Sequence, residues 1–209
     1  MSSKKSSMLK NILSIFAITL VAVLLLAVVN QVTRDPIAKA EIDARNQTYS
    51  EVFADAKDFK DLDMSEEEIV KNGEKALSDA DIASCEINHA MKAVDGDTVL
   101  GYVIAATSKN GYGGKIQIAV GINNDGEITG FSVISHNETA GLGAKSKDDP
   151  EFAAQFKGKT ASESIEVIKG GGATGNQIDA ISGATITSKA VTEATNAATA
   201  FYNAYLKGE

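Results

Sequence analysis

The first pattern along the chain is an apolar run close to its start. Residues 12–29 are interrupted by polar side chains only at Ser14 and Thr19. Because a helix rises about 1.5 Å per residue, this run comes close to crossing a hydrocarbon layer of about 30 Å. The run therefore predicts a transmembrane helix over residues 11–30.

A cleaved signal peptide is the alternative interpretation of the same run. Lysines precede it, and Ala38-Lys39-Ala40 resembles a small-residue cleavage site. That site lies far beyond the end of the apolar run, however, and the run is longer than the apolar part of a typical signal peptide. These two features favour a retained helix.

Alternating apolar positions dominate the middle of the chain. Ile116, Ile118, Val120 and Ile122 are separated by polar or small residues, which is the period of a strand. Asp-Gly pairs at 95–96 and 125–126 are typical of the tight turns between antiparallel strands. We therefore predict an antiparallel meander. Its strands are expected at 87–93, 98–108, 115–123 and 127–135, with a loop at 110–114.

The last pattern has the period of an α-helix. Apolar and small residues recur at spacings of three and four from Ile186 to Leu206, which predicts a helix with one face packed on the sheet. A shorter helix is expected near 152–156. An antiparallel meander with helices before and after it predicts an α+β fold rather than a parallel doubly wound one. The expected fold is an antiparallel sheet packed with helices, preceded by one N-terminal transmembrane helix.

The region between the apolar run and the first strand is less regular. Asp35-Pro36 can begin a helix, which a loosely amphipathic stretch continues to about Lys57. Residues 58–81 are mostly acidic and polar, and we interpret them as a solvated surface segment, although 65–68 resembles a helix start. The patterns divide the chain into an N-terminal segment, a transmembrane helix, a helical and polar connecting region and a folded domain. Their bounds are 1–10, 11–30, 31–84 and 85–209.

Charge is unevenly distributed along the chain. The first 34 residues contain three lysines, Arg34 and no acidic residue, whereas the remainder has 16 basic and 28 acidic residues, a balance of −12. The positive-inside rule therefore places residues 1–10 in the cytoplasm and the folded domain outside the cell (inner) membrane. The acidic body would repel nucleic acid, so no nucleic-acid partner is expected. A lone Cys85 excludes an internal disulfide and a multi-cysteine metal site, and no metal site is predicted.

Residues 179–188, Asp-Ala-Ile-Ser-Gly-Ala-Thr-Ile-Thr-Ser, stand directly before and at the start of the last predicted helix. A helix N-terminus offers unpaired N–H groups and partial positive charge, and Gly183 and Ala184 allow a phosphate to approach closely. The alternative is that Ser182, Thr185 or Thr187 simply caps the helix. Local physics alone favours capping.

The same ten residues resemble the flavinylation motif of an FMN-binding domain. This domain is shared by the G subunit of Rnf electron-transport complexes and the C subunit of Na⁺-pumping NADH:quinone reductases. In that family an aspartate, two residues, Ser or Thr, a small residue, Ala and Thr follow one another. The residues that match each place are Asp179, Ser182, Gly183, Ala184 and Thr185.

The resemblance implies covalent FMN. A separate Mg²⁺-dependent flavin transferase would move FMN from FAD onto the Thr185 hydroxyl as a phosphoester, so that Thr185 is an acceptor and no residue of the chain is catalytic. Thr187 and Ser188 correspond to the first turn beyond the motif and are interpreted as helix caps.

Two further segments agree with this resemblance. Residues 138–143, Glu-Thr-Ala-Gly-Leu-Gly, resemble a loop that lies beside the flavin ring in the family, with Ala140 where many members have proline. Tyr112-Gly113-Gly114 is a weaker match to a third loop, and a plain hairpin connection is its alternative role. The complete set of predicted cofactor-binding residues is Tyr112, Glu138, Thr139, Gly141, Leu142, Gly143, Asp179, Ser182, Gly183, Ala184 and Thr185.

The resemblance implies a membrane-anchored electron-transfer subunit of an Rnf-type ion-translocating ferredoxin:NAD⁺ oxidoreductase, which is not catalytic alone. Its implied partners are the other membrane subunits of that complex, the flavin transferase and the membrane. Residues 85–209 would be the FMN-binding domain. The C subunit of a Na⁺-pumping NADH:quinone reductase, or another FMN-binding extracytoplasmic electron carrier, is the alternative.

Two other classes of function are alternatives to an electron carrier. A hydrolase could use His136 and Glu138 for acid–base chemistry, but no nucleophile motif accompanies them. With His89 as the only other histidine, a zinc site is poorly supplied. A non-catalytic adaptor with an acidic docking surface is the third class, and a yellow colour that survives denaturation would separate the first class from both.

Overall fold

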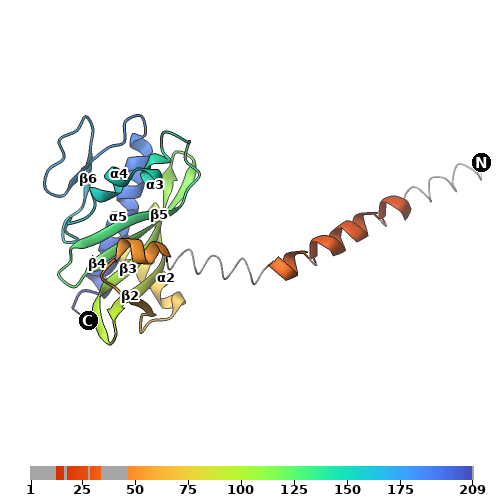
Figure 1. Cartoon of the computed structure of the whole chain (residues 1–209), viewed down its shortest axis with the longest axis horizontal. Helices are drawn as coiled ribbons and strands as arrows, with labels where there is room; N and C mark the ends of the chain where they lie inside the picture. Colours follow the sequence, from red (N-terminus) through yellow and green to blue (C-terminus); the bar gives the residue numbers. More distant parts are fainter. Residues whose placement is uncertain (1–12, 17, 28, 34–46, 209) are drawn as a thin grey trace, which may run out of the picture. The chain divides into compact units, whose positions relative to one another are not determined.

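The computed structural model describes residues 13–16, 18–27, 29–33 and 47–208 and divides into two compact units, Met1–Ala44 and Arg45–Glu209 (Figure 1). The described residues of the first unit belong to a helix, Leu13–Thr33. By length and composition it can cross a membrane, and no other helix in the described ranges passes that test. Over the described residues, the expected membrane helix is confirmed as an apolar span. The expected helix start at Asp35-Pro36 and the alternative cleavage site at 38–40 lie outside the described residues.

A five-stranded antiparallel sheet forms the centre of the second unit, with its strands in sequence order. The strands are β1 (Asp58–Asp61), β2 (Cys85–Asp95), β3 (Thr98–Gly111), β4 (Gly114–Asn123) and β5 (Ile128–Ser135). The predicted meander is confirmed as β2 to β5. Gly96 and Gly126 have φ angles of 64° and 78°, which is the left-handed conformation that Asp-Gly turns require.

Helix α5 (Thr185–Tyr205) packs on one face of this sheet, and the helical residues 47–52 pack on the other (Figure 1). Val191, Ala194 and Phe201 of α5 are fully buried in one cluster with isoleucines of β3 and β4. Alanines on this face lack bulk, so the helix axis can approach the sheet closely. The predicted terminal helix and its packing face are therefore confirmed.

The acidic segment 58–81 was wrongly expected to be solvated throughout, because it contains β1 and helix α2 (Glu66–Asp79). Ser65 is the N-cap of α2 and forms a capping box with Glu68: the Ser65 N–H donates to Glu68 Oε2 at 2.8 Å, and the Glu68 N–H donates to Ser65 Oγ at 3.3 Å. Ile69 and Leu77 are buried on the inner face. The acidic first turn of α2 interacts favourably with the positive end of the helix dipole.

Short elements connect β5 to α5. They are α3 (Lys145–Asp148), α4 (Pro150–Ala154), and the parallel pair β6 (Glu166–Ile168) and β7 (Gln177–Asp179). The short helix expected near 152–156 is present as α4. Its Phe152 is buried, and Phe156 just beyond it stacks on Phe131 of β5 with ring centroids 4.2 Å apart. These contacts fix the path of the chain that leads to the start of α5.

Candidate functional site

Three segments that are far apart in the sequence meet at the first turn of α5. The tip of the β3–β4 hairpin, the loop after β5 and the turn before α5 line a cavity of about 530 Å³. This volume lies in the range of small-molecule and cofactor sites, roughly 300–1,000 Å³. The lining residues are Tyr112, Glu138, Thr139, Leu142, Gly143, Gly183, Ala184, Thr185, Ile186 and Thr187.

The structure therefore brings together all of the predicted cofactor-binding residues except Asp179, Ser182 and Gly141. Asp179 ends β7, and its Oδ1 accepts from the Ala173 N–H at 3.1 Å. This hydrogen bond ties the glycine-rich residues 170–175 to the chain that enters α5. Gly141 has a φ of 76° in the turn of the loop, and Ser182 is exposed. These three residues shape the surroundings of the cavity rather than its wall.

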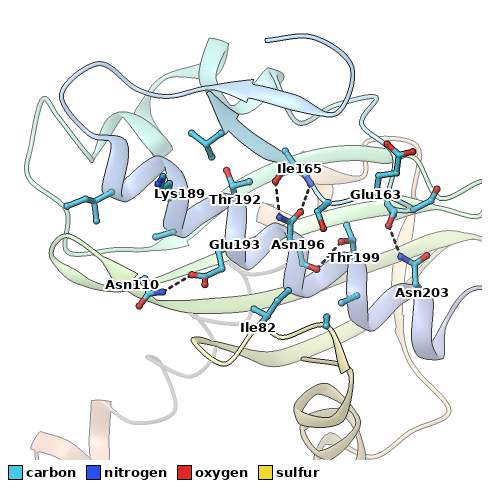
Figure 2. A pocket seen from close by; sticks show the side chains of 18 residues that line it. Ile82, Asn110, Glu163, Ile165, Lys189, Thr192, Glu193, Asn196, Thr199 and Asn203 are labelled. Carbon is cyan, nitrogen blue, oxygen red and sulfur yellow. Dashed lines mark hydrogen bonds between the residues drawn. The ribbon is translucent and has the colours of Figure 1, made fainter. Parts of the chain in front are cut away.

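A larger cavity, of about 640 Å³, runs along the flank of α5 and shares only Ile186 with the first (Figure 2). Many of its polar groups already have protein partners. Asn196, for example, exchanges two hydrogen bonds with the backbone of Ile165, at 2.8 and 2.9 Å. We therefore regard the smaller cavity, where backbone donors remain available, as the better cofactor site.

The start of α5 supplies those donors. Ala184 is the N-cap residue and no side chain caps the helix. The first backbone bond of the helix runs from the Ser188 N–H to the Ala184 carbonyl at 3.0 Å. Within the described part of the chain, the N–H groups of Thr185, Ile186 and Thr187 have no backbone or side-chain acceptor. Such a terminus carries partial positive charge and suits a phosphate.

Ser188 fixes the turn that precedes the helix. Its Oγ accepts from the Ile181 N–H at 2.9 Å and donates to the Ala184 carbonyl at 3.0 Å. Gly183 adopts a φ of 77° within this turn, which explains a glycine at that place. As a result, Thr185 is the first helical residue and is half-buried at the wall of the cavity.

Glu138 connects the three segments. Its side chain is 8% exposed, its Oε1 accepts from the Gly113 N–H at 2.8 Å, and its Oε2 accepts from Thr187 Oγ1 at 2.5 Å. A Cβ on Gly143 would lie 2.5 Å from Glu138 Oε2, so only glycine fits beside this carboxylate. A buried charge is stable only when it is hydrogen-bonded, and Glu138 takes its donors from both the hairpin and α5. This one buried acid therefore holds the hairpin, the loop and α5 together.

The expectation that Thr187 or Ser188 caps α5 is wrong. Thr187 is 1% exposed and its hydroxyl donates to Glu138, while Ser188 bridges within the turn. The hydrolase alternative also loses its pair, because His136 Nδ1 accepts from the backbone N–H of Glu138 at 3.0 Å and the carboxylate serves Gly113 and Thr187. No group of three or more candidate metal ligands occurs in the described ranges.

The mouth of the cavity carries exposed apolar side chains. Tyr112, Leu142 and Ile186 are 71%, 46% and 53% exposed. Among the described residues after position 46, Val70 is the only other large hydrophobic side chain of this kind. Exposed apolar side chains gathered around one opening are typical of a ligand or partner site.

These features fit FMN. The uncapped helix start suits a phosphate, and Thr185 lies at the wall of the cavity. The apolar rim of Tyr112, Leu142 and Ile186 suits a planar ring. Thr187 and Ile186 are cavity residues that the sequence motif did not mark, and only their place in the first turn after Thr185 could have indicated them.

Comparison with known proteins agrees with the geometry. The model of the FMN-binding domain matches residues 111–200, and the model of the RnfG N-terminal region matches residues 1–52. The solved structure of the C subunit of the Na⁺-translocating NADH-quinone reductase from Parabacteroides distasonis has the same fold, with a TM-score of 0.54 and 24% identity. It covers 81% of this chain and 94% of that one.

Curated relatives extend over most of the chain. The G subunit of the Na⁺-translocating ferredoxin:NAD⁺ oxidoreductase complex of Acetobacterium woodii is 37% identical over 88% of this chain and 86% of its own length. The G subunit of the proton-translocating complex of Clostridium ljungdahlii is 36% identical, covering 86% and 87%. The G subunit of the ion-translocating oxidoreductase complex of Methanosarcina acetivorans is 32% identical, covering 97% and 98%. The chain therefore belongs to the RnfG family, the G subunits of ion-translocating oxidoreductase complexes, and contains its FMN-binding domain.

Proposed function

We propose that this chain is a membrane-anchored electron carrier that holds FMN covalently, through a phosphoester on Thr185, in the cavity at the start of α5. The observation that carries the proposal is that Thr185, Ile186 and Thr187 line one cavity and that their backbone N–H groups have no acceptor within the described part of the chain. The bound flavin supplies one- and two-electron chemistry, and the protein supplies position and electrostatics.

Attachment is a group transfer onto Thr185. The Thr185 oxygen forms the new bond to the flavin phosphate of FAD, the bond between the two phosphates breaks, and AMP leaves with the hydroxyl proton transferred to a base. We propose that a separate Mg²⁺-dependent flavin transferase performs this step, as the resemblance implies. The half-exposed position of Thr185 at the first helical residue leaves its hydroxyl within reach of such an enzyme.

Each part of the cavity has a role in this proposal. The N–H groups at the start of α5 stabilise the negative phosphate, and Gly183 allows it to approach the backbone. Tyr112 and Leu142 offer apolar surface to the ring. Glu138 holds the walls of the site together, and Thr139, Gly141 and Gly143 shape the loop beside the ring.

The N-terminal helix fits a membrane anchor. We propose that residues 1–10 are cytoplasmic and that the FMN-binding domain lies outside the inner membrane, because lysines precede the helix and the body is acidic. The division of the chain at 11–30, 31–84 and 85–209 is part of the same proposal. A single helix cannot by itself couple electron flow to ion movement, so the carrier works with the other membrane subunits of an ion-translocating ferredoxin:NAD⁺ oxidoreductase.

The decisive experiment is co-expression of the full chain with a flavin transferase, followed by a denaturing gel and mass spectrometry. Wild type should give a fluorescent band, and the peptide that contains Thr185 should gain the mass of FMN less one water. Thr185→Val keeps the shape and removes the oxygen, so it should give no band. Thr187→Ser is the control, because it keeps a hydroxyl for Glu138 and should retain the band. A fluorescent Thr185→Val chain would refute the acceptor, and a wild-type chain without flavin would refute the proposal.

Orientation needs a separate measurement. A cysteine introduced as Lys207→Cys, near the exposed end of the domain, should react with an impermeant maleimide on intact spheroplasts. The native Cys85 is buried and should not react with the maleimide. Labelling that appears only after lysis would reverse the proposed orientation.

A further inference from the structure

A second carboxylate, Glu193, lies on α5 about two turns beyond Thr185 and faces the end of β3. It accepts hydrogen bonds from Ser84 Oγ, from Ser108 Oγ at 3.1 Å and from Asn110 Nδ2 at 3.0 Å. Figure 2 shows Asn110 and Glu193 reaching toward each other at the wall of the larger cavity. No cation pairs with Glu193 in the part of the chain that the structure describes, so neutral donors alone satisfy the charge.

These donors stand directly before the hairpin tip. The pairing of β3 with β4 shifts register between Ser108 and Gly111, so Lys109 and Asn110 have no partner on β4 and the pairing resumes only at Gly111 and Gly114. Ser108 Oγ also accepts from the Asn110 N–H at 3.2 Å, which links the two donors to each other. Glu193 therefore holds, through Ser108 and Asn110, the part of the hairpin where the pairing with β4 is interrupted.

Glu138 holds the tip from the other side, through the Gly113 N–H at 2.8 Å. Tyr112 lies between the two attachment points, one at Asn110 and one at Gly113. Both carboxylates are also connected to α5: Glu193 is part of this helix, and Glu138 accepts a hydrogen bond from Thr187 of the helix. The hairpin is thus attached twice to the helix that begins at the FMN acceptor.

We propose that Glu193 is a positioning residue that holds the Tyr112 side chain over the flavin cavity. Tyr112 is 71% exposed yet lines the cavity, so its place depends on the hairpin backbone rather than on packing around its ring. This inference rests on the proposed function, because the Tyr112 ring gains its purpose only with a flavin beside it. Glu193 does not line the flavin cavity, and it acts on that cavity through its hydrogen bonds to the base of the hairpin tip.

Flavin emission in the native, loaded chain tests the proposal, because a phenol ring held against a flavin quenches its fluorescence. Loss of a charge-assisted hydrogen bond shifts an equilibrium by roughly tenfold or more, so Glu193→Gln should release the tip in a larger share of molecules. Native emission per flavin should then rise toward that of Tyr112→Leu. Asn110→Ala removes the other partner of this hydrogen bond and should also raise the emission. Asn110 is exposed, so its replacement should leave the fold intact.

The matched control is Glu163→Gln. Glu163 lines the same larger cavity, and the change removes the same charge. Among the described residues, its side chain has no hydrogen-bond or ion-pair partner, and its backbone carbonyl accepts from Asn176. Its emission should equal that of wild type. In a Tyr112→Leu background, Glu193→Gln should have no further effect on emission, which a general loss of structure would not reproduce.

Three outcomes are distinguishable. Emission that rises with Glu193→Gln and Asn110→Ala only when Tyr112 is present supports the proposal. Emission that is unchanged, or that rises equally in the Tyr112→Leu background, overturns it. The fluorescent band on a denaturing gel should be equal in all variants, and its absence from wild type would instead be the failure of the proposed function.

Discussion

Replacing Thr187 by valine tests the role of the buried Glu138 carboxylate. Thr187 is 1% exposed, and its hydroxyl donates to Glu138 Oε2 at 2.5 Å. Valine keeps the shape of threonine but carries a methyl group in place of the hydroxyl, so Glu138 would keep only the Gly113 N–H as a donor. A hydrogen bond to a charged group contributes about 1.5–3 kcal/mol, and we expect a loss of that size in the free energy of unfolding.

The matched control is Thr195→Val in the same helix. Thr195 is fully buried, but its hydroxyl donates to the Val191 carbonyl at 2.9 Å, a group that the helix backbone can satisfy. Its loss should cost under about 1 kcal/mol, because such back-bonding adds little to a helix.

Thermal unfolding of the full chain in mild detergent, followed by circular dichroism before flavin loading, measures both changes. For a domain of this size, the Tm of Thr187→Val should fall by about 3–12 °C and that of Thr195→Val by less than about 4 °C. Thr187→Ser restores the donor and should recover most of the loss. Equal shifts for the two valine variants would refute the assigned role of the Glu138–Thr187 hydrogen bond.

Three further predictions follow from particular contacts. Gly143→Ala should lower the free energy of unfolding, measured in urea, by about 1–3 kcal/mol, because the new Cβ would lie 2.5 Å from Glu138 Oε2. An unchanged free energy of unfolding would contradict the tight packing at this glycine. Burial, followed by the nearby negative charge of Glu193, raises the pKa of the Cys85 thiol to about 11. Maleimide labelling of Cys85 at pH 8 should therefore be at least about a hundredfold slower than that of free cysteine. Rapid labelling would show that the site is open to solvent. The Lys109 ammonium beside Glu86 lowers the pKa of that carboxyl, so this half-exposed pair stabilises the fold at neutral pH by under about 1 kcal/mol. The difference in stability between wild type and Lys109→Met should therefore vanish as pH falls from about 4.5 through the lowered pKa, and a difference that persisted at pH 2 would exclude this cause.

The main elements of the fold could be predicted because their patterns are regular. The alternation from Ile116 to Ile122 and the Asp-Gly turns defined β2 to β5, and the three- and four-residue spacing defined α5. Helix α2 escaped prediction because its buried positions, Ile69 and Leu77 among them, are diluted by glutamates and lysines. The three-residue strands β6 and β7 are too short to show any period.

The residues of the candidate site could be predicted only in part. The motif around Thr185 and the loop at 138–143 are local in sequence, so resemblance could identify them. The contacts made by Thr187 and Glu193 depend on which strand end lies opposite α5, and one helix sequence does not contain that information. Both residues also obey the ordinary rules for a helix, Thr187 as a possible cap and Glu193 as a solvated acid, so nothing in the sequence set them apart.

The bare start of α5 would give a cofactor attached at Thr185 a second role. A helix that begins without a cap forgoes roughly 0.5–2 kcal/mol, and a phosphate bound to the N–H groups of Thr185 to Thr187 would act as the missing cap. A freely bound ligand loses this effect when it is diluted, whereas a tethered phosphate remains at a fixed effective concentration. If Thr185 carries FMN, maturation therefore completes the helix as well as the redox site. Chains that miss the transferase would remain the less stable population, and proteases that attack transiently opened molecules would remove them first.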